Sequence, residues 1–289
     1  MKKFFLFAIF LISLKSGFAQ FENIDLGARP IALNGAFTSI ADNSQAIFYN
    51  PSGLGQMYNR EIAFFYSPAP YGLSELAIAA LTYAEPTKYG TFGVGIKTYG
   101  FELYRELNVL LSYGNNYKDK IYYGMNFNFY NLKIENYNSA SSFGLDLGAM
   151  AYLHKYVRWG FIAKNFTGAK IGESKEKIAQ VYRTGLNFVP LQNLNLVLEV
   201  EKDVKYPLSF RSGMEYSVLD YVDLRFGVGS EPTNFAGGIG LSYDLFQLDY
   251  ALTKSPDLGI THQGTLTVNF GGIAGKKKNR ERIYTTFKD

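Results

Sequence analysis

Residues 265–270 read Thr-Leu-Thr-Val-Asn-Phe, and this short stretch shows the pattern that decides the fold. Leu266, Val268 and Phe270 alternate with polar residues. Because side chains on a β-strand point alternately to its two faces, the stretch has one apolar face and one polar face. The same alternation recurs in 195–200 (Asn-Leu-Val-Leu-Glu-Val) and 223–228 (Asp-Leu-Arg-Phe-Gly-Val). The sequence therefore predicts an all-β protein.

The alternation extends over most of the chain, and the predicted strands are close to the length that a tilted strand needs to cross a bilayer. Short turns alternate along the chain with longer loops rich in Lys, Glu, Ser and Asn, as in a barrel with one short-turned end. We predict a transmembrane antiparallel up-and-down β-barrel of about 14 strands with an N-terminal hatch or plug segment. Strands are expected at 61–67, 74–84, 90–101, 103–114, 120–133, 142–153, 156–166, 179–189, 193–202, 207–217, 221–229, 234–243, 245–254 and 260–270.

A soluble β-sandwich is the alternative, because its strands also alternate apolar and polar positions. Charges of both signs in mid-strand favour the barrel, since they can pair and stay hydrated in a lumen. A basic residue facing lipid at mid-depth would cost roughly 2–4 kcal/mol. The candidate lumen charges are Asp146, Arg183, Arg211, Glu215, Asp223, Arg225 and Asp249. Tyrosines near strand ends fit a belt at the membrane interface; they are Tyr113, Tyr122, Tyr152, Tyr216 and Tyr243.

The N-terminus has the features of a secretory signal peptide. Lys2 and Lys3 precede an apolar run over 4–14, and Gly17 and Ala19 supply small residues before a cleavage site. We predict a signal peptide over 1–19 and export to the bacterial outer membrane. The chain has no Cys, so disulfides and thiolate metal sites are excluded.

The net charge of +4 comes from the ends of the chain. Residues 276–289 carry six basic and two acidic residues, and the leader adds three Lys, whereas residues 20–275 hold 20 basic and 23 acidic residues. A basic face for nucleic acid is therefore not indicated.

Two segments lack the alternation, so four regions are expected: a signal peptide at 1–19, a hatch at 20–60, the barrel at 61–270 and a basic periplasmic tail at 271–289. The hatch has room for one or two short helices, the second ended by Pro51 and Gly53. It would lie inside or beneath the lumen, or alternatively form a loose periplasmic arm. The tail would be a solvated end, or would contact anionic lipid headgroups or a partner.

The hatch segment carries a family resemblance. Residues 27–37 read Gly-Ala-Arg-Pro-Ile-Ala-Leu-Asn-Gly-Ala-Phe, and residues 41–54 read Ala-Asp-Asn-Ser-Gln-Ala-Ile-Phe-Tyr-Asn-Pro-Ser-Gly-Leu. Together they resemble the N-terminal signature of the PorV/PorQ-type outer-membrane proteins, which belong to the FadL-like β-barrel superfamily. The chain departs from that signature at Asn34, where the family often has Gly, and at Ser52, where it often has Ala.

The resemblance implies an outer-membrane barrel with a hatch shaped by Asn50, Pro51 and Gly53 and anchored through ion pairs by Arg29 and Asp42. PorV/PorQ-like members serve type IX secretion, whereas FadL-like members pass hydrophobic compounds. We therefore expect a scaffold or shuttle in protein secretion, with transport of small hydrophobic molecules as the alternative. The expected partners are outer-membrane lipid, secretion-system or exported proteins, and hydrophobic small molecules, with no nucleic acid.

Enzyme chemistry is not indicated by the sequence. The two histidines, His154 and His262, have no third ligand at metal spacing, and no residue is marked as a nucleophile. We expect no catalytic site, no cofactor and no metal.

Overall fold

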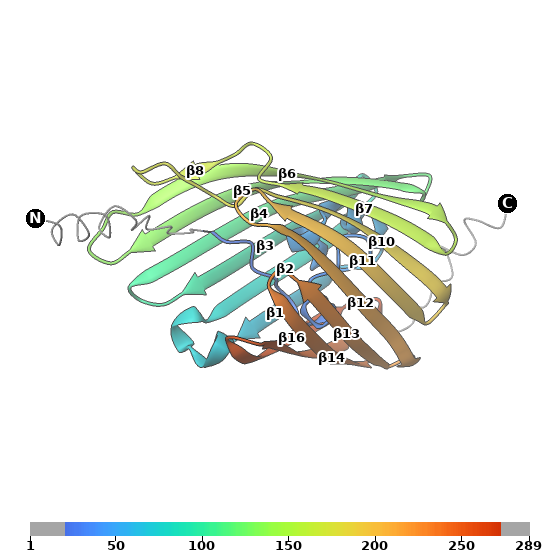
Figure 1. Ribbon diagram of the computed structural model, residues 1–289. Coiled ribbons are helices and arrows are strands. Elements are labelled where there is room, and N and C mark those ends of the chain that lie inside the picture. The colour runs from blue at the N-terminus through green and yellow to red at the C-terminus, as the bar shows by residue number, and fades with distance from the viewer. Residues whose placement is uncertain (1–20, 273–289) are drawn as a thin grey trace, which may run out of the picture.

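Fourteen strands close into an antiparallel barrel in the computed structural model, which describes residues 21–272 (Figure 1). Each barrel strand pairs with its neighbour in the chain, and β1 closes the ring against β16. The predicted fold class is confirmed. The barrel strands are β1 (Glu61–Ser67), β2 (Ile78–Thr87), β3 (Gly90–Gly100), β4 (Tyr104–Tyr117), β5 (Ile121–Ile134), β6 (Ala140–His154), β7 (Val157–Lys164), β10 (Val181–Leu191), β11 (Leu194–Asp203), β12 (Leu208–Leu219), β13 (Val222–Ser230), β14 (Thr233–Tyr243), β15 (Phe246–Ser255) and β16 (Gly259–Asn269).

The two ends of the barrel differ in their connections. One end, the turn end, has only short connections, at 88–89, 118–120, 155–156, 192–193, 220–221 and 244–245. The opposite end, the loop end, carries the long connection 68–77, with the 3₁₀ turns η2 (Pro70–Gly72) and η3 (Ser74–Leu76). It also carries 165–180, whose β8 (Lys170–Ile171) and β9 (Glu176–Lys177) pair as a small separate sheet.

The barrel turns its apolar face outward and its charged face inward. Leu198 and Phe226 are 64% and 50% exposed on the outer surface, whereas Arg183 and Arg225 are 1% and 5% exposed inside. A water-soluble protein buries its large apolar side chains instead, so this inverted pattern suits lipid outside and a polar lumen within. None of the helices among residues 21–272 is long and apolar enough to span a membrane.

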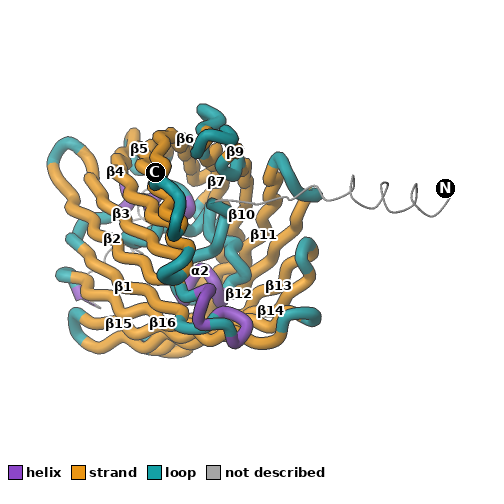
Figure 2. Tube along the Cα trace, turned by 90° about the vertical axis from the view of Figure 1, so that its left-hand side faces the viewer, coloured by secondary structure: helices purple, strands orange, loops and turns teal. Residues whose placement is uncertain are grey.

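Residues 21–57, here called the plug, lie inside the barrel (Figure 2). They contain α2 (Ala28–Ala32), α3 (Ala46–Tyr49) and the 3₁₀ helix η1 (Pro51–Gln56). Apolar plug side chains such as Phe37 and Ile47 are fully buried and form a common core with inward-facing wall residues such as Phe65. The hydrophobic core therefore sits in the lumen, between plug and wall.

Several expectations are changed by the structure. The second short helix, α3, ends at Tyr49, with the extended residue Asn50 before Pro51, as expected; Pro51 and Gly53 then lie within a further helical turn, η1. The strand expected at 74–84 starts only at Ile78, since η2 and η3 occupy the preceding residues. Tyr122 and Tyr152 are not interfacial: both are buried, and the Tyr152 hydroxyl donates to Gln56 Oε1. The predicted signal peptide and residues 273–289 of the tail lie outside the described residues.

Candidate functional site: the plugged lumen and its cavities

Asp25 joins the plug to two arginines of the wall. Its carboxylate lies 2.5 Å from Nη1 of Arg211 on β12 and 3.1 Å from Nη2 of Arg183 on β10. Glu201 on β11 pairs with the same two arginines, so the cluster is shared between plug and wall. Burial by itself raises the pKa of Asp25, but Arg211 and Arg183 outweigh it and hold the pKa below its ordinary value of 3.8.

Arg29 makes the second link between plug and wall. Its Nε and Nη2 donate to Glu215 at 2.7 and 2.9 Å, a two-point contact, and its Nη1 lies 2.5 Å from Asp42. Although burial opposes the charged form, Asp42 and Glu215 raise the pKa of Arg29 above its ordinary value. Asp42 itself belongs to the plug. Arg29 and Asp42 were both expected to anchor the plug. Arg29 forms an ion pair with the wall, whereas the ion pair of Asp42 is with Arg29.

The predicted lumen charges all lie on the inner face of the wall. Arg225 on β13 contacts Glu215 at 2.7 Å, Asp249 at 2.8 Å and Asp223 at 3.3 Å. Asp146 on β6 stands apart from this network, accepting from Asn126 Nδ2 at 2.9 Å and from the Asn165 backbone at 2.7 Å. The network over β10–β15 is thus a set of paired charges, and Asp146 is a local hydrogen-bond acceptor.

Wall carboxylates also accept hydrogen bonds from plug backbone amides. Glu199 accepts from Thr38 N at 2.8 Å, Glu61 from Ser44 N at 2.9 Å, and Glu106 from Phe21 N at 2.8 Å. All three amides lie outside the plug helices, and these charge-assisted bonds supply each of them with an acceptor. The plug is therefore held along its length by groups from many strands.

Asn50 of the sequence motif bonds to the plug and to the wall at the same time. Its Nδ2 donates to Thr38 O at 2.9 Å and to Ala149 O of β6 at 3.1 Å, while its Oδ1 accepts from Ser52 and caps η1. Gly53 is required by close approach, since a Cβ there would lie 2.0 Å from Ala41 O. Pro51 begins η1, where its missing N–H costs nothing.

Inward-facing glycines let the plug backbone touch the wall. A Cβ on Gly124 would lie 2.4 Å from Pro51 C, and one on Gly160 would lie 2.5 Å from Thr38 O. On the far side of the barrel, a Cβ on Gly227 would lie 2.4 Å from Leu33 C. Such distances exclude any side chain unless the plug moves. The glycines therefore form a seat shaped to the plug.

Residues 21–25, here called the strap, cross the lumen toward the loop end. Asn23 Nδ2 donates to Glu201 at 3.2 Å, and Lys164 Nζ donates to Asn23 Oδ1 at 2.9 Å. The Tyr206 hydroxyl donates to Glu22 at 2.9 Å. The strap lines two cavities, one on each side of it.

The larger cavity, of about 350 Å³, lies between the strap and strands β12, β14, β15, β16, β1, β2 and β3. Its apolar lining includes Tyr71, Ile78 and Tyr99, and uncharged polar side chains line it on the neighbouring strands β14, β15, β16 and β1. Its charged lining groups are Glu22, Asp25 and Arg211, of which Asp25 and Arg211 pair with each other. Its volume falls within the range of small-molecule sites.

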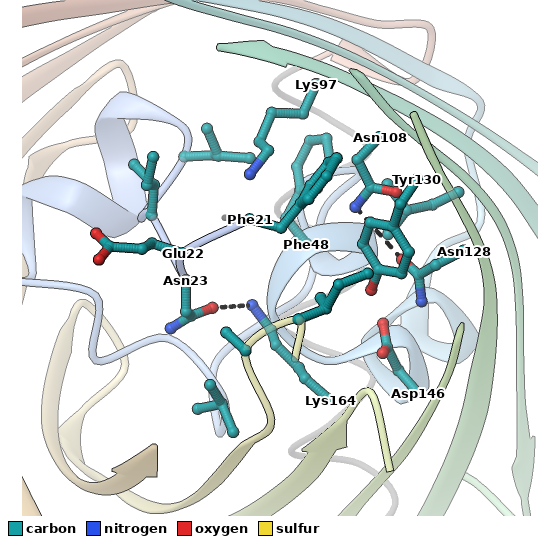
Figure 3. Close-up of a pocket in the computed structure, with 16 residues that line it drawn as sticks. Phe21, Glu22, Asn23, Phe48, Lys97, Asn108, Asn128, Tyr130, Asp146 and Lys164 are labelled. Carbon is teal, nitrogen blue, oxygen red and sulfur yellow. Dashed lines mark hydrogen bonds between the residues drawn. The ribbon is translucent and has the colours of Figure 1, made fainter. Parts of the chain in front are cut away.

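The smaller cavity, of about 70 Å³, is a polar pocket beside the rings of Phe21 and Phe48 (Figure 3). Lys97 and Lys164 point toward it from different sides, and Asn108 and Asn128 bond to each other at its edge. It has room for a few water molecules rather than a substrate. Within residues 21–272, no group of three or more His, Asp and Glu side chains is placed to bind a metal.

The sequence analysis missed the strap and several buried lumen residues. Asp25 stands in a segment without alternation, and its partners are more than 150 residues away. Lys97 and Glu106 lie at inward positions of β3 and β4. A charge within an alternating strand is the sequence feature that could have identified both as lumen residues. The inward glycines carried no sequence signal that separates them from glycines of the outer face.

Comparison with solved structures shows the same barrel in outer-membrane proteins. A monoaromatic hydrocarbon channel, CymD, matches with a TM-score of 0.66 at 11% identity, over 87% of this chain and 99% of its own. A Pseudomonas aeruginosa FadL homologue matches at 0.63 and 9% identity, over 86% and 99%. The P. putida toluene transporter TodX matches at 0.62 and 11% identity, over 84% and 96%.

Comparisons of the sequence with protein-family models and with curated proteins found no match. At 9–11% identity, the structural likeness establishes the fold alone. The chain therefore has the barrel fold of FadL-like outer-membrane proteins.

Proposed function

We propose that the protein resides in the bacterial outer membrane and takes up small hydrophobic molecules through the cavity at its loop end. The observation that supports this proposal best is the cavity of about 350 Å³, lined by the strap and by residues of seven strands, among them the apolar side chains of Tyr71, Ile78 and Tyr99. An apolar cavity of about 150 Å³ is enough to bind benzene. The larger cavity can therefore hold a substituted aromatic ring. The hydrocarbon channels among the structural neighbours support this proposal through their shared fold.

The plug limits how such a molecule crosses the barrel. The glycine seat and the links through Asp25 and Arg29 hold the plug at both sides of the lumen. Passage through the centre would require those contacts to break. The strap separates the two cavities, so its displacement would extend the larger cavity inward once its bonds to Glu201 and Tyr206 and the ion pairs of Asp25 are broken.

Uptake of radiolabelled butylbenzene into Gram-negative cells tests this function. Cells with the wild-type protein in their outer membrane should take up the probe faster than cells with an empty vector. Ile78→Trp should reduce uptake to the vector level, because residue 78 is 5% exposed and faces the cavity. Leu81→Trp is the matched control, since Leu81 lies on the outer face of the same strand. Equal uptake by wild type and vector would remove the transport proposal.

A role as a scaffold or shuttle in type IX-like secretion, of the PorV/PorQ kind, is the second candidate. It is favoured by the firmly seated plug and by apolar side chains exposed at the loop end: Tyr137 is 77% exposed and Leu103 is 51% exposed. Deleting the gene in its own bacterium tests this role. Loss of secreted proteins with unchanged uptake of butylbenzene would favour the scaffold over the transporter.

A further inference from the structure

The larger cavity has an uncharged polar strip beside its apolar wall. The strip follows the barrel wall over neighbouring strands and consists of hydroxyl and amide side chains: Asn234 on β14, Thr253 and Ser255 on β15, Thr261 and Gln263 on β16, and Ser67 on β1. The strand register continues the same row onto apolar residues, since Ser67 pairs with Ile78 and Ile78 pairs with Tyr99. Polar and apolar walls therefore meet at Ser67.

Two oxygens of the strip have no hydrogen-bond partner among the described residues. They are Oγ of Ser67 and Oδ1 of Asn234, and both atoms are buried. Other members of the strip already have partners: Gln263 Nε2 donates to Thr253 at 3.3 Å, and Thr261 Oγ1 accepts from Tyr71 N at 2.9 Å. Buried polar atoms are normally paired with protein or bound molecules. The two free oxygens thus call for a hydrogen-bond donor within the cavity.

The charges of the cavity disfavour an anionic occupant. Arg211 is the cation among its lining residues, and it is already engaged by Asp25 at 2.5 Å and by Glu201 at 2.9 Å. Glu22 and Asp25 add two carboxylates to the same lining. A ligand carboxylate would meet net negative charge in a partly buried site, where repulsion is strong.

We infer that the ligand of this cavity is an uncharged molecule that combines an apolar part with hydroxyl groups, an alcohol or phenol rather than a plain hydrocarbon or a carboxylic acid. This inference rests on the proposed function and names its substrate class. The apolar part packs against Tyr71, Ile78 and Tyr99, and a hydroxyl donates to Oγ of Ser67 at the boundary of the two walls. A second hydroxyl, on a larger ligand, reaches Asn234 across the strip.

A matched probe series tests this substrate class with the purified full-length protein in detergent. The probes are butylbenzene, 4-phenylbutan-1-ol and 4-phenylbutanoate, which share a phenyl ring on a four-carbon chain and differ in the end group. Binding to each is measured by calorimetry as the difference between wild type and Ile78→Trp. The filled cavity of this variant corrects for probe that enters the micelle.

The alcohol should bind about tenfold more tightly than butylbenzene, as expected for a hydrogen bond to an otherwise unpaired buried group. Ser67→Ala should remove most of this advantage and leave butylbenzene unchanged. Ser212→Ala, on the outer face of β12, is the control and should change neither affinity.

The other outcomes separate the two proposals. Butylbenzene binding as tightly as the alcohol, with Ser67→Ala without effect, would overturn the substrate class and leave uptake of hydrophobic molecules standing. Tightest binding of 4-phenylbutanoate would also overturn the class and would direct attention to Lys97 and Lys164 in the smaller cavity. No difference from Ile78→Trp for any of the probes would count against the transport function itself.

Discussion

At the scale of single residues, the plug is held by side chains that one substitution can release. Glu215 is 5% exposed and lies between Arg29 of the plug and Arg225 of β13. Arg29 has Asp42 as its other ion-pair partner, and that carboxylate belongs to the plug, so the ion pair that joins Arg29 to the wall depends on Glu215. Glu215 is therefore the wall residue on which the attachment of α2 most depends.

Glu215→Gln should lower the free energy of unfolding by about 1–3 kcal/mol, because Arg29 loses its two-point contact with the wall and keeps only Asp42 as an ion-pair partner. Urea unfolding in lipid vesicles, followed by tryptophan fluorescence, measures the change. Asp223→Asn is the control, since its side chain is 15% exposed and Arg225 keeps two other carboxylates. Equal shifts in the two variants would contradict a special role for Glu215.

Asp25 makes the strap sensitive to acid. The pKa of Asp25 is lower in the folded protein than its ordinary value of 3.8, so its charged form stabilises the attached strap at any pH above that value. The stabilisation is lost as the pH falls below it toward the folded-state pKa. Wild type should therefore melt at a higher temperature than Asp25→Asn at about pH 7, and the difference should shrink steadily below about pH 4. A difference that stays constant down to about pH 2.5 would show that Asp25 is not the group responsible.

The ion pairs between plug and wall show which single residues can be predicted from the sequence and which cannot. Arg183, Arg211 and Glu215 were found because charge in the middle of an alternating strand is a local signal. Their partners Asp25 and Arg29 lie 158 to 186 positions away. No periodicity connects residues that far apart. The inward direction of each wall charge was thus predictable, whereas the identity of its plug partner was not.

At the scale of elements, strands were easier to predict than the plug. Alternation with a period of two is a property of the strand itself, so β3, β5 and β11 were placed within two residues of their ends. The plug helices have four to six residues, and the first amide of α2, Ala28 N, donates to Thr265 Oγ1 of the wall. Helices so short are not stable alone and leave little pattern in the sequence.

The glycine seat makes a prediction about the fit between plug and wall. Gly124→Ala should loosen the plug, because the added Cβ would lie 2.4 Å from the Pro51 carbonyl carbon. The expected cost is about 1–3 kcal/mol, as for other overpacked sites. Faster protease cleavage within residues 21–57 of the intact barrel would reveal the loosening.

Gly237→Ala is the matched control for this experiment. Gly237 also lies in a barrel strand, but a Cβ there would approach no closer than 3.8 Å to its nearest neighbour, Arg225 O. It should leave cleavage of the plug at the wild-type rate. Equal rates for the Gly124 variant and wild type would contradict a close-fitting seat.

At the scale of the whole molecule, the inverted distribution of side chains decides the interpretation. Large apolar residues are exposed around the outside of the barrel, and charged residues are buried within it. The fold shared with outer-membrane channels agrees with this distribution. Within residues 21–272 the fourteen long strands form one closed ring and the second sheet is only the short pair β8–β9, which does not fit a sandwich of two packed sheets.

The most direct test of lipid contact uses Trp159, the only tryptophan of the chain. It lies beside Phe161 on the outer face of β7, and its indole N–H donates to Thr184 at 3.0 Å. The protein is refolded into vesicles whose lipids carry bromine on their acyl chains, and its fluorescence is compared with that in unbrominated vesicles. Strong quenching is expected, because bromine quenches only at close range. Unquenched emission typical of water, from a protein that also stays folded and monomeric in buffer without detergent, would contradict the claim that the apolar outer face meets lipid.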